Sequence, residues 1–271
     1  MRTFDRRQEF DERSREYSIR TLLGDAPTLQ TKVWDIDVWL DQGSEGACVG
    51  YSFAHEIAAE PVPGDVDGQY ARHIYFEAQK VDQWPGEDYS GTSVLAGAKT
   101  VATLGWFDEY RWAFSIDDAL ASLSNIGPAV FGTNWYEGMY DTDADGYIHR
   151  TGNLAGGHAI LALGYDHEKQ AVLLHNSWGP GWGENGRAWL SVEDFTTLMY
   201  EFGEFCIPLV RADINAPVEP EPVEPEPVEP EPVEPEPVEP EPVEPEPQPQ
   251  QDFITRFINW LLDLITSWFS R

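Results

Sequence analysis

The hydrophobic pattern of residues 1–215 changes part-way along the chain, from helix-like segments to short apolar runs. Periodic apolar residues between turn-forming residues predict helices at 48–60, 69–81, 92–105 and 117–125. Gly105 fits a helix C-cap, and the Gly127–Pro128 pair ends the last of these helices. Later runs are short and separated by turn signals, which predicts strands at AVFGTNW, HAILALGYD, AVLLHNSW and RAWLSV. Helices first and strands later indicate an α+β fold.

Residues 216–251 are of low complexity and contain six copies of VEPEP. Each proline fixes its own φ and lacks an N–H, so neither a helix nor a sheet can form there. We expect a disordered linker with polyproline II (PPII) character, about 90 Å long over the repeats and stiffened by repulsion between glutamates. A passive spacer is the simplest interpretation, and binding to a proline-recognising domain is the alternative.

The last twenty residues, 252–271, are strongly apolar again and predict an amphipathic helix. One narrow polar face carries Asp252, Arg256, Asn259, Asp263, Thr266 and Ser270. Such a helix is expected to self-associate, to dock onto a protein partner, to lie on a membrane surface, or to pack back onto the globular part. These changes in composition divide the chain into four parts: an extension at 1–29, a globular domain at 30–215, the linker at 216–251 and the helix at 252–271.

Composition excludes some classes of function. The net charge of -31 argues against nucleic-acid binding, which needs a basic surface, although twelve of the glutamates belong to the VEPEP repeats. Two cysteines make no disulfide framework and fit a reducing compartment. The first twenty residues lack the apolar core of a signal peptide, and no segment is apolar and long enough to span a bilayer. We therefore expect a cytoplasmic protein of microbial or viral (phage) origin, with peripheral membrane association as an option through 252–271.

The stretch QGSEGACVGYSF, residues 42–53, places Cys48 at the predicted start of a helix. A thiol becomes a good nucleophile only as a thiolate, which a helix N-terminus and a nearby histidine favour. A base and a group that orients the base are then needed. His158 follows two glycines at the start of a predicted strand, and Asn176 precedes a Ser-Trp-Gly turn. A buried structural cysteine is the alternative, and it is the one we assign to Cys206.

Several segments, in this order, resemble the papain-like cysteine peptidases. QGSEGAC is similar to the family's Gln-Gly-Ser-x-Gly-x-Cys stretch, GGHAILALGYD to its histidine segment, and NSWGPGWGENG to its asparagine segment. SGTSVLAGAKTVATLGW and NIGPAVFGTNWYEGMYD also resemble family stretches, so the likeness covers about residues 30–210. It implies a two-lobed fold, with an N-terminal helical lobe and a C-terminal antiparallel β lobe, and peptide-bond hydrolysis without a cofactor or metal.

The resemblance also implies roles for individual residues. Cys48 would be the nucleophile, and His158 its imidazolium partner and the acid that protonates the leaving amine. Asn176 would hold the imidazole in plane, and Trp178 would cover that hydrogen bond. Gln42 would donate its side-chain NH₂ to the oxyanion, together with the Cys48 backbone N–H.

The substrate-binding assignments are looser. The resemblance places Gly91 where a glycine pairs with substrate backbone. It places Gly132 and Ala159 near the pocket for the second residue before the scissile bond, and no side-chain preference is assigned. A polypeptide is the expected substrate, and restraint by a long inhibitory propeptide is not expected because only 41 residues precede Gln42.

Two positions near Cys48 depart from the family pattern. Glu45 stands where the family often has a disulfide-forming cysteine, and Val49 where an aromatic residue is usual. No role follows for Glu45 from the sequence. His158 and Asn176 also follow Cys48 at shorter spacings than usual, which indicates trimmed loops.

DTDADGY, residues 141–147, is similar to the start of an EF-hand loop, but Gly152 stands where the twelfth-position glutamate is required. We interpret it as an acidic hairpin tip, with a calcium site at Asp141, Asp143 and Asp145 as the alternative. The leading functional hypothesis is an endopeptidase tethered to a docking or membrane-surface helix. The alternatives are a catalytically silent papain-fold scaffold, and an assembly protein whose peptidase processes its partners.

Overall fold

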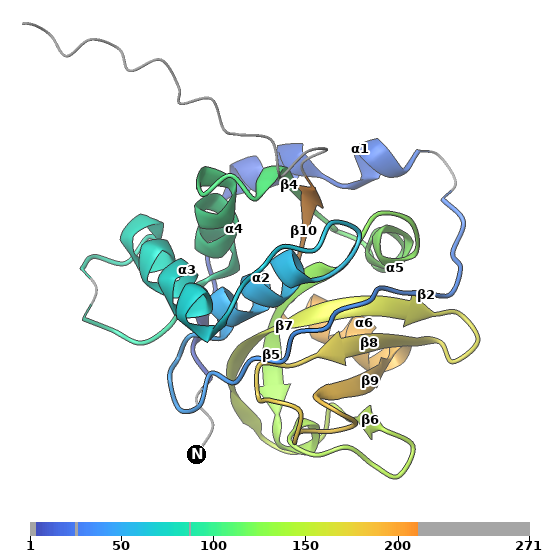
Figure 1. The fold of residues 1–271 in the computed structure, drawn as a ribbon. Helices are drawn as coiled ribbons and strands as arrows, with labels where there is room; N and C mark the ends of the chain where they lie inside the picture. The colour runs from blue at the N-terminus through green and yellow to red at the C-terminus, as the bar shows by residue number, and fades with distance from the viewer. Residues whose placement is uncertain (1–3, 25–26, 87, 211–271) are drawn as a thin grey trace, which may run out of the picture. The chain divides into compact units, whose positions relative to one another are not determined.

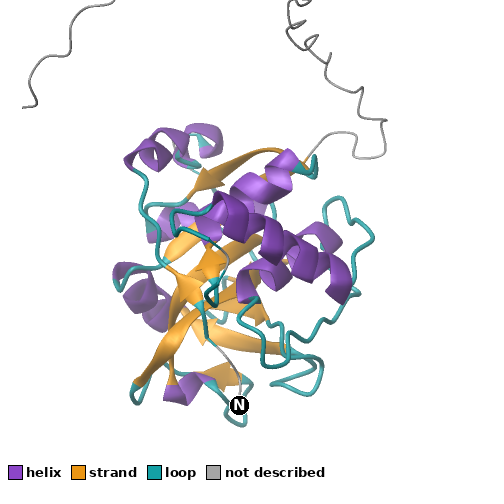
Figure 2. Cartoon of the chain, turned by 90° about the vertical axis from the view of Figure 1, so that its left-hand side faces the viewer, coloured by secondary structure: helices purple, strands orange, loops and turns teal. Residues whose placement is uncertain are grey.

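The computed structural model describes residues 4–24, 27–86 and 88–210. The predicted linker at 216–251 and helix at 252–271 lie outside the described residues. The described chain is mixed α and β, as predicted, with a group of helices beside a twisted sheet (Figures 1 and 2). None of the described helices is long and apolar enough to cross a bilayer.

Three helices form one side of the molecule, α2 (Cys48–Ala58), α3 (Gly68–Val81) and α4 (Val94–Thr103). Side chains cap two of them, because Asp67 accepts from the Tyr70 N–H at α3 and Ser93 from the Ala96 N–H at α4. Small residues let the helices approach closely. A Cβ added at Gly50 would lie 2.4 Å from the Ala71 carbonyl oxygen, so α2 and α3 touch backbone to backbone there.

The large sheet has the strand order β4-β10-β5-β7-β8-β9-β6, with β2 (Lys32–Val33) paired to β7. Its pairs are antiparallel except β6 with β9. The strands are β4 (Phe107–Trp112), β5 (Ala129–Tyr136), β6 (Tyr147–Ile148), β7 (Leu154–Asp166), β8 (Ala171–His175), β9 (Arg187–Ser191) and β10 (Glu204–Val210). The helices α5 (Ile116–Asn125) and α6 (Val192–Tyr200) contact this sheet.

Two hydrophobic clusters hold the described chain together. One joins α2, α3 and α4 to β7 and includes Phe53, Ile74 and Leu161. The other lies around β5 and α6 and includes Phe131 and Phe195. Strand β7 contributes to both clusters, so the start of α2 lies against the strand that carries His158.

The four predicted helices and the four predicted strands between 48 and 192 all occur, with shifted ends. The sequence did not reveal β4, β10 or α6. Strand β4 carries mostly polar residues (FDEYRW) and pairs with β10 from the far end of the described chain, so its partner is invisible to local pattern reading.

The N-terminal segment belongs to the same compact unit as residues 30–210. It contains β1 (Arg6–Arg7), the 3-10 helix η1 (Glu12–Tyr17) and α1 (Arg20–Leu23). In Figure 1 it is the dark blue stretch that leads from the marked N-terminus toward α1 at the top of the view. Strand β1 pairs in parallel with β3 (Thr92–Ser93), directly before α4.

Candidate active site

Cys48 is the first residue of α2 and is fully buried. Its sulfur accepts hydrogen bonds from the backbone N–H groups of Ala159 and Asp5. Burial raises the pKa of the Cys48 thiol, and these two hydrogen bonds oppose the rise only in part. The Cys48 sulfur thus lies beside the His158–Ala159 peptide, in surroundings that favour the neutral thiol.

His158 and Asn176 meet across neighbouring strands. His158 lies on β7 and Asn176 directly follows β8, which pairs with β7. The His158 Nε2 and the Asn176 Oδ1 are 2.9 Å apart, and both residues are fully buried. Asn176 Oδ1 accepts from Nε2, because the same oxygen also accepts from the Ser177 N–H and an amide oxygen cannot donate. Nδ1 is then the ring nitrogen left for chemistry with a thiol.

Aromatic rings enclose the His158 imidazole. The Trp178 ring centroid lies 5.2 Å from the imidazole centroid, and that of Trp135 lies 4.8 Å away in an edge-on arrangement. Phe4 is the third ring, at 5.6 Å. Trp178 is the residue expected to cover the His158–Asn176 hydrogen bond, whereas sequence reasoning missed Trp135 and Phe4. A register argument would have found Trp135, since it lies on β5 two residues beyond Thr133, the partner of His158.

Gln42 is buried and fixed at both ends of its amide. Its Oε1 accepts from the Ser177 hydroxyl at 2.6 Å, and its Nε2 donates to the Glu45 carbonyl at 2.8 Å. Its backbone N–H also donates to the Ser177 carbonyl. The loop before Cys48 is thus tied to the segment after Asn176, and the Gln42 NH₂ keeps a second hydrogen for another acceptor.

The N-terminal segment lies across these residues. Asp5 pairs in parallel with Gly157, and a Cβ added at Gly91 would lie 1.8 Å from the Asp5 carbonyl oxygen. Gly91 therefore contacts a peptide backbone, as the resemblance implied, but the backbone is the chain's own. The sequence offered no signal for this arrangement, because the extension at 1–29 matched no family stretch.

Gly132 and Ala159 are cross-strand partners on β5 and β7. A Cβ added at Gly132 would lie 3.1 Å from the Arg6 Nε and 3.3 Å from the Glu204 Oε2. The expected subsite position is thus filled by the Arg6 side chain, facing an acid at the start of β10. Glu204 is a further residue of the site that sequence reasoning missed, because β10 itself was not predicted.

Glu45 forms a two-pronged ion pair with Arg72 of α3, at 2.7 and 3.0 Å. Arg72 also lies over the Phe76 ring. An ion pair therefore links the loop before Cys48 to α3, at the position where the family often has a disulfide-forming cysteine. Cys48 and Cys206 are both free.

The acidic turn at 141–147 is organised around Asp143. Its carboxylate accepts from the backbone N–H groups of Asp145 and Tyr147 and contacts the His149 ring at 2.7 Å. No group of three or more potential metal-ligating side chains occurs among the residues that the structure describes. These contacts are those of a closed turn.

Comparisons with known proteins agree with this architecture. The family model for papain family cysteine proteases matches residues 69–198, a stretch that includes His158 and Asn176 and begins after Cys48. The crystal structure of xylellain, a cysteine protease from Xylella fastidiosa, shares the fold with a TM-score of 0.57 and 19% identity, over 77% of this chain and 96% of that one.

Curated relatives include a cathepsin B-like cysteine proteinase of Caenorhabditis elegans, 42% identical over 56% of this chain and 47% of the relative. A peptidase C1-like protein of Acanthamoeba polyphaga mimivirus is 24% identical over 54% of this chain and 62% of the relative. The chain thus spans about half to three fifths of the length of these relatives. The fold is that of a papain-like cysteine peptidase, and residues 69–198 resemble the papain family in sequence.

Proposed function

We propose that this chain is a cysteine-type endopeptidase that hydrolyses peptide bonds through Cys48, His158 and Asn176. The observation that carries the proposal is the buried His158–Asn176 pair beside the sulfur at the start of α2. A pair of this kind fixes the imidazole orientation and leaves Nδ1 for proton exchange with the thiol.

In the proposed reaction the Cys48 thiolate attacks the substrate carbonyl carbon. The oxyanion that forms accepts from the Cys48 backbone N–H and from the second hydrogen of the Gln42 NH₂. The His158 imidazolium protonates the leaving amine, so the C–N bond breaks and an acyl-enzyme remains. Water then attacks the acyl-enzyme while His158 takes its proton, which releases the acid product and restores the Cys48 thiolate and the His158 imidazolium.

The described state precedes this reaction. Asp5 and Arg6 lie where substrate would bind, and burial raises the pKa of the Cys48 thiol. Removal of the N-terminal segment would open the sulfur to solvent, which lowers the desolvation cost of a thiolate. Catalysis therefore requires that residues 4–7 move away from Cys48.

Covalent labelling tests the proposal. The full chain is treated under reducing conditions with an epoxide inhibitor that reacts with activated thiolates, and the adduct is located by mass spectrometry. We expect one adduct at Cys48, none on Cys48→Ala, and much slower reaction on His158→Ala. Cys206 serves as the internal control, because it is the second free cysteine and has no proposed base or helix N-terminus beside it. No adduct at Cys48 in either the full chain or an Arg6→Ala variant, in which the N-terminal segment is held less firmly, would leave a catalytically silent scaffold as the better interpretation.

We further propose that the acidic linker at 216–251 tethers the peptidase to a docking helix at 252–271 that binds itself, a protein partner or a membrane surface. Support comes from the repeat and from the apolar face of the last twenty residues. Sedimentation and liposome flotation of the full chain, compared with a Trp260→Glu, Leu264→Glu double variant, test this. Identical behaviour of the two proteins in both assays would reject self-association and membrane binding.

A further inference from the structure

Two fully buried histidines, His55 and His175, contact each other edge to face, with ring centroids 4.5 Å apart. His55 lies on α2, roughly two turns after Cys48. His175 is the last residue of β8 and directly precedes Asn176. The pair therefore joins the helix of the proposed nucleophile to the strand that leads to Asn176.

Both histidines also bind the backbone of the segment 34–40, which leads to the loop of the proposed oxyanion donor. This segment belongs to no helix or strand, so its backbone groups need partners elsewhere. The Leu40 N–H donates to the His55 Nε2 at 3.1 Å, and the His175 Nε2 donates to the Val38 carbonyl at 3.0 Å. The side chains that join α2 to β8 thus fix a third segment of the site as well.

The end of this segment is tied to the turn after Asn176. The Leu40 carbonyl accepts from the Gly179 N–H at 3.0 Å, and the Gln42 N–H donates to the Ser177 carbonyl at 2.9 Å. Both backbone polar groups of Leu40 are therefore bonded, the N–H to a side chain of α2 and the carbonyl to this turn. Because Gln42 follows two residues later, a shift of Leu40 also shifts the start of the Gln42 loop.

The Nε2 atom of His55 is the part of the ring that forms a hydrogen bond. Because Nε2 accepts from a backbone N–H, the neutral ring carries its proton on Nδ1, which has no hydrogen-bond partner among the described residues. A buried donor without a partner costs free energy, and an apolar side chain would avoid that cost. Burial also lowers the pKa of His55 well below its ordinary value, so Nε2 remains an acceptor near neutral pH. A fixed acceptor for Leu40 is what histidine provides here and an apolar residue would not.

We propose that His55 is a positioning residue for the oxyanion donor Gln42, acting through the Leu40 N–H. The inference rests on the proposed function, in which the second hydrogen of the Gln42 NH₂ binds the oxyanion. Without the His55 acceptor the buried Leu40 N–H must find another partner, which requires the segment before Gln42 to move. The oxyanion exists only after attack on the substrate carbonyl, so a displaced Gln42 lowers kcat and leaves KM nearly unchanged.

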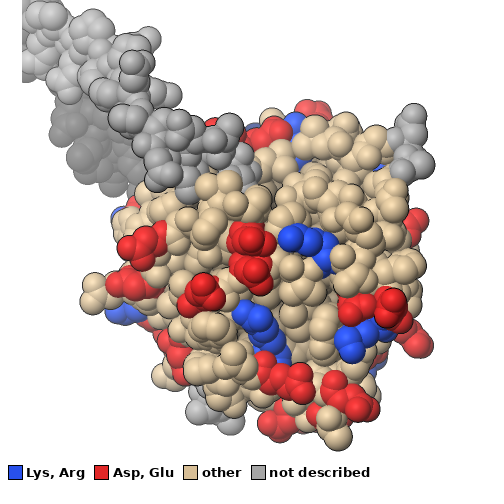
Figure 3. Space-filling view, turned by 45° about the vertical axis from the view of Figure 1, so that its right-hand side comes forward, with Lys and Arg blue, Asp and Glu red and all other residues tan. Residues whose placement is uncertain are grey.

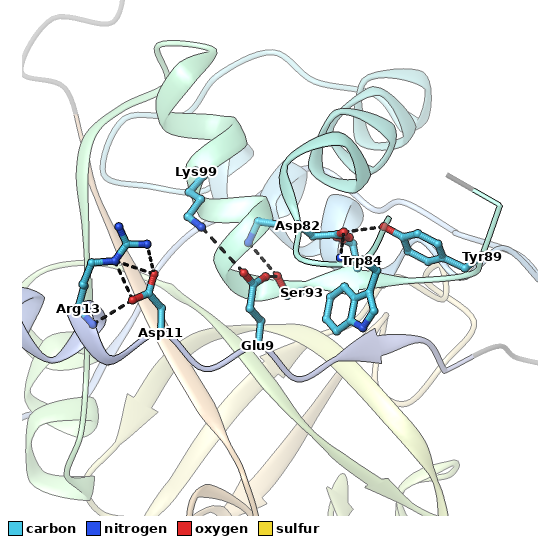
Figure 4. A network of polar contacts seen from close by, with 10 residues as sticks. Glu9, Asp11, Arg13, Asp82, Trp84, Tyr89, Ser93 and Lys99 are labelled. Carbon is cyan, nitrogen blue, oxygen red and sulfur yellow. Dashed lines mark hydrogen bonds and ion pairs between the residues drawn. The ribbon is translucent and has the colours of Figure 1, made fainter. Parts of the chain in front are cut away.

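The polar network around Asp82 provides a matched control. Asp82 is the C-cap of α3, and its carboxylate accepts from the Trp84 N–H and the Tyr89 hydroxyl (Figure 4) and from the Thr92 hydroxyl. Among the described residues, its side-chain hydrogen bonds reach only the loop after α3 and the start of β3. Loss of Asp82 should therefore disturb the fold without acting through Gln42.

A double-variant cycle in the full chain tests the inference. His55→Leu should lower kcat for a peptide substrate by roughly 10-fold and leave KM within about 2-fold of the parent, because it displaces a group that acts only in the transition state. In a Gln42→Ala background the same change should lower kcat by less than about 2-fold, since the donor that His55 positions is already gone. His55→Gln, whose Oε1 can accept from the Leu40 N–H, should restore most of the rate. Asp82→Ala should change kcat by the same factor in both backgrounds.

The side-chain amide of Gln42 gives a second readout that needs no turnover. Its two signals in a nitrogen–proton correlation spectrum are identified by their loss in Gln42→Ala. We expect them to move in His55→Leu, to return toward the parent position in His55→Gln, and to stay in place in Asp82→Ala.

Three results would each overturn the inference: an equal loss of kcat with and without Gln42, no rescue by His55→Gln, or unmoved Gln42 signals in a folded His55→Leu protein. Thermal denaturation identifies a variant that does not fold, and His55→Met then takes the place of His55→Leu. Absence of turnover in the parent chain would reject the proposed chemistry, while the spectrum would still decide whether His55 positions Gln42.

Discussion

Two histidines behind the site, His55 and His175, are held neutral by their surroundings. His175 Nε2 donates to the Val38 carbonyl at 3.0 Å, and Nδ1 accepts from Arg187 at 3.2 Å, so both nitrogens are used by the neutral ring. His55 is equally buried, and its Nε2 accepts from the Leu40 N–H. The two rings meet edge to face with centroids 4.5 Å apart. A positive charge on either ring would therefore lie close to the other ring and to Arg187.

A pH dependence of stability follows from this pair. Burial and the Arg187 charge lower the pKa of His175 to about 4, against 6.5 for a free histidine, and burial lowers the pKa of His55 as well. The unfolded chain then binds more protons between pH 6.5 and 4, so stability is full above that window and falls as the pH drops through it. We expect His175 alone to remove about 2 kcal/mol of the free energy of unfolding between pH 7 and 5.

Urea denaturation at the two pH values measures this loss. His175→Gln should show a smaller loss than the parent protein, while His149→Gln, at an exposed site, should match the parent. An equal pH dependence in His175→Gln would contradict the assignment.

Elements were predictable where their pattern is local. Helix α2, with apolar and small residues and a stop before Pro61, and strand β7, a long apolar run after two glycines, both follow from the sequence. Strand β4 did not, because Asp108, Glu109 and Arg111 break its apolar pattern and its partner β10 lies at the far end of the described chain. The alignment of Cys48, His158 and Asn176 could be expected from the family resemblance alone, whereas Glu204 and the N-terminal segment depend on non-local pairing.

The close approach of α2 and α3 gives a test at this scale. An alanine at Gly50 would place its Cβ 2.4 Å from the Ala71 carbonyl oxygen and 2.8 Å from the Tyr75 backbone nitrogen. Neither backbone atom can move without shifting a helix, so Gly50→Ala should cost about 1–3 kcal/mol despite the better helix propensity of alanine. Gly181→Ala is the matched control, because nothing lies within 4 Å of its Cβ position. Equal stability of the two variants would show that the helices can separate at no cost.

At the scale of the whole molecule, the α+β fold was predicted from the sequence, whereas the N-terminal segment that lies across Cys48 was not. Sequence reasoning did not expect restraint by a long inhibitory propeptide and assigned no role to the extension at 1–29. Four residues, Phe4–Arg7, nevertheless lie across the sulfur, and Arg6 lies beside Glu204. The Phe4 ring against His158, the buried Arg6 guanidinium and the parallel pairing of β1 with β3 all contribute to holding this segment in place.

Acidic and basic residues are unevenly distributed along the whole chain. The VEPEP repeats hold a quarter of the 48 acidic residues and no basic residue. On the described part, acidic and basic side chains lie interspersed over a largely uncharged face (Figure 3).

Turnover of a fluorogenic peptide substrate tests most directly whether Cys48 cleaves peptide bonds. The full chain, Arg6→Ala, and Arg6→Ala with Cys48→Ala are compared, with Arg13→Ala as the control for an exposed arginine of the same segment. We predict faster turnover by Arg6→Ala than by the parent chain, parent-like turnover by Arg13→Ala, and none by the double variant. Turnover that survives Cys48→Ala, or an Arg6→Ala protein with no activity and an intact fold, would contradict the assignment of Cys48.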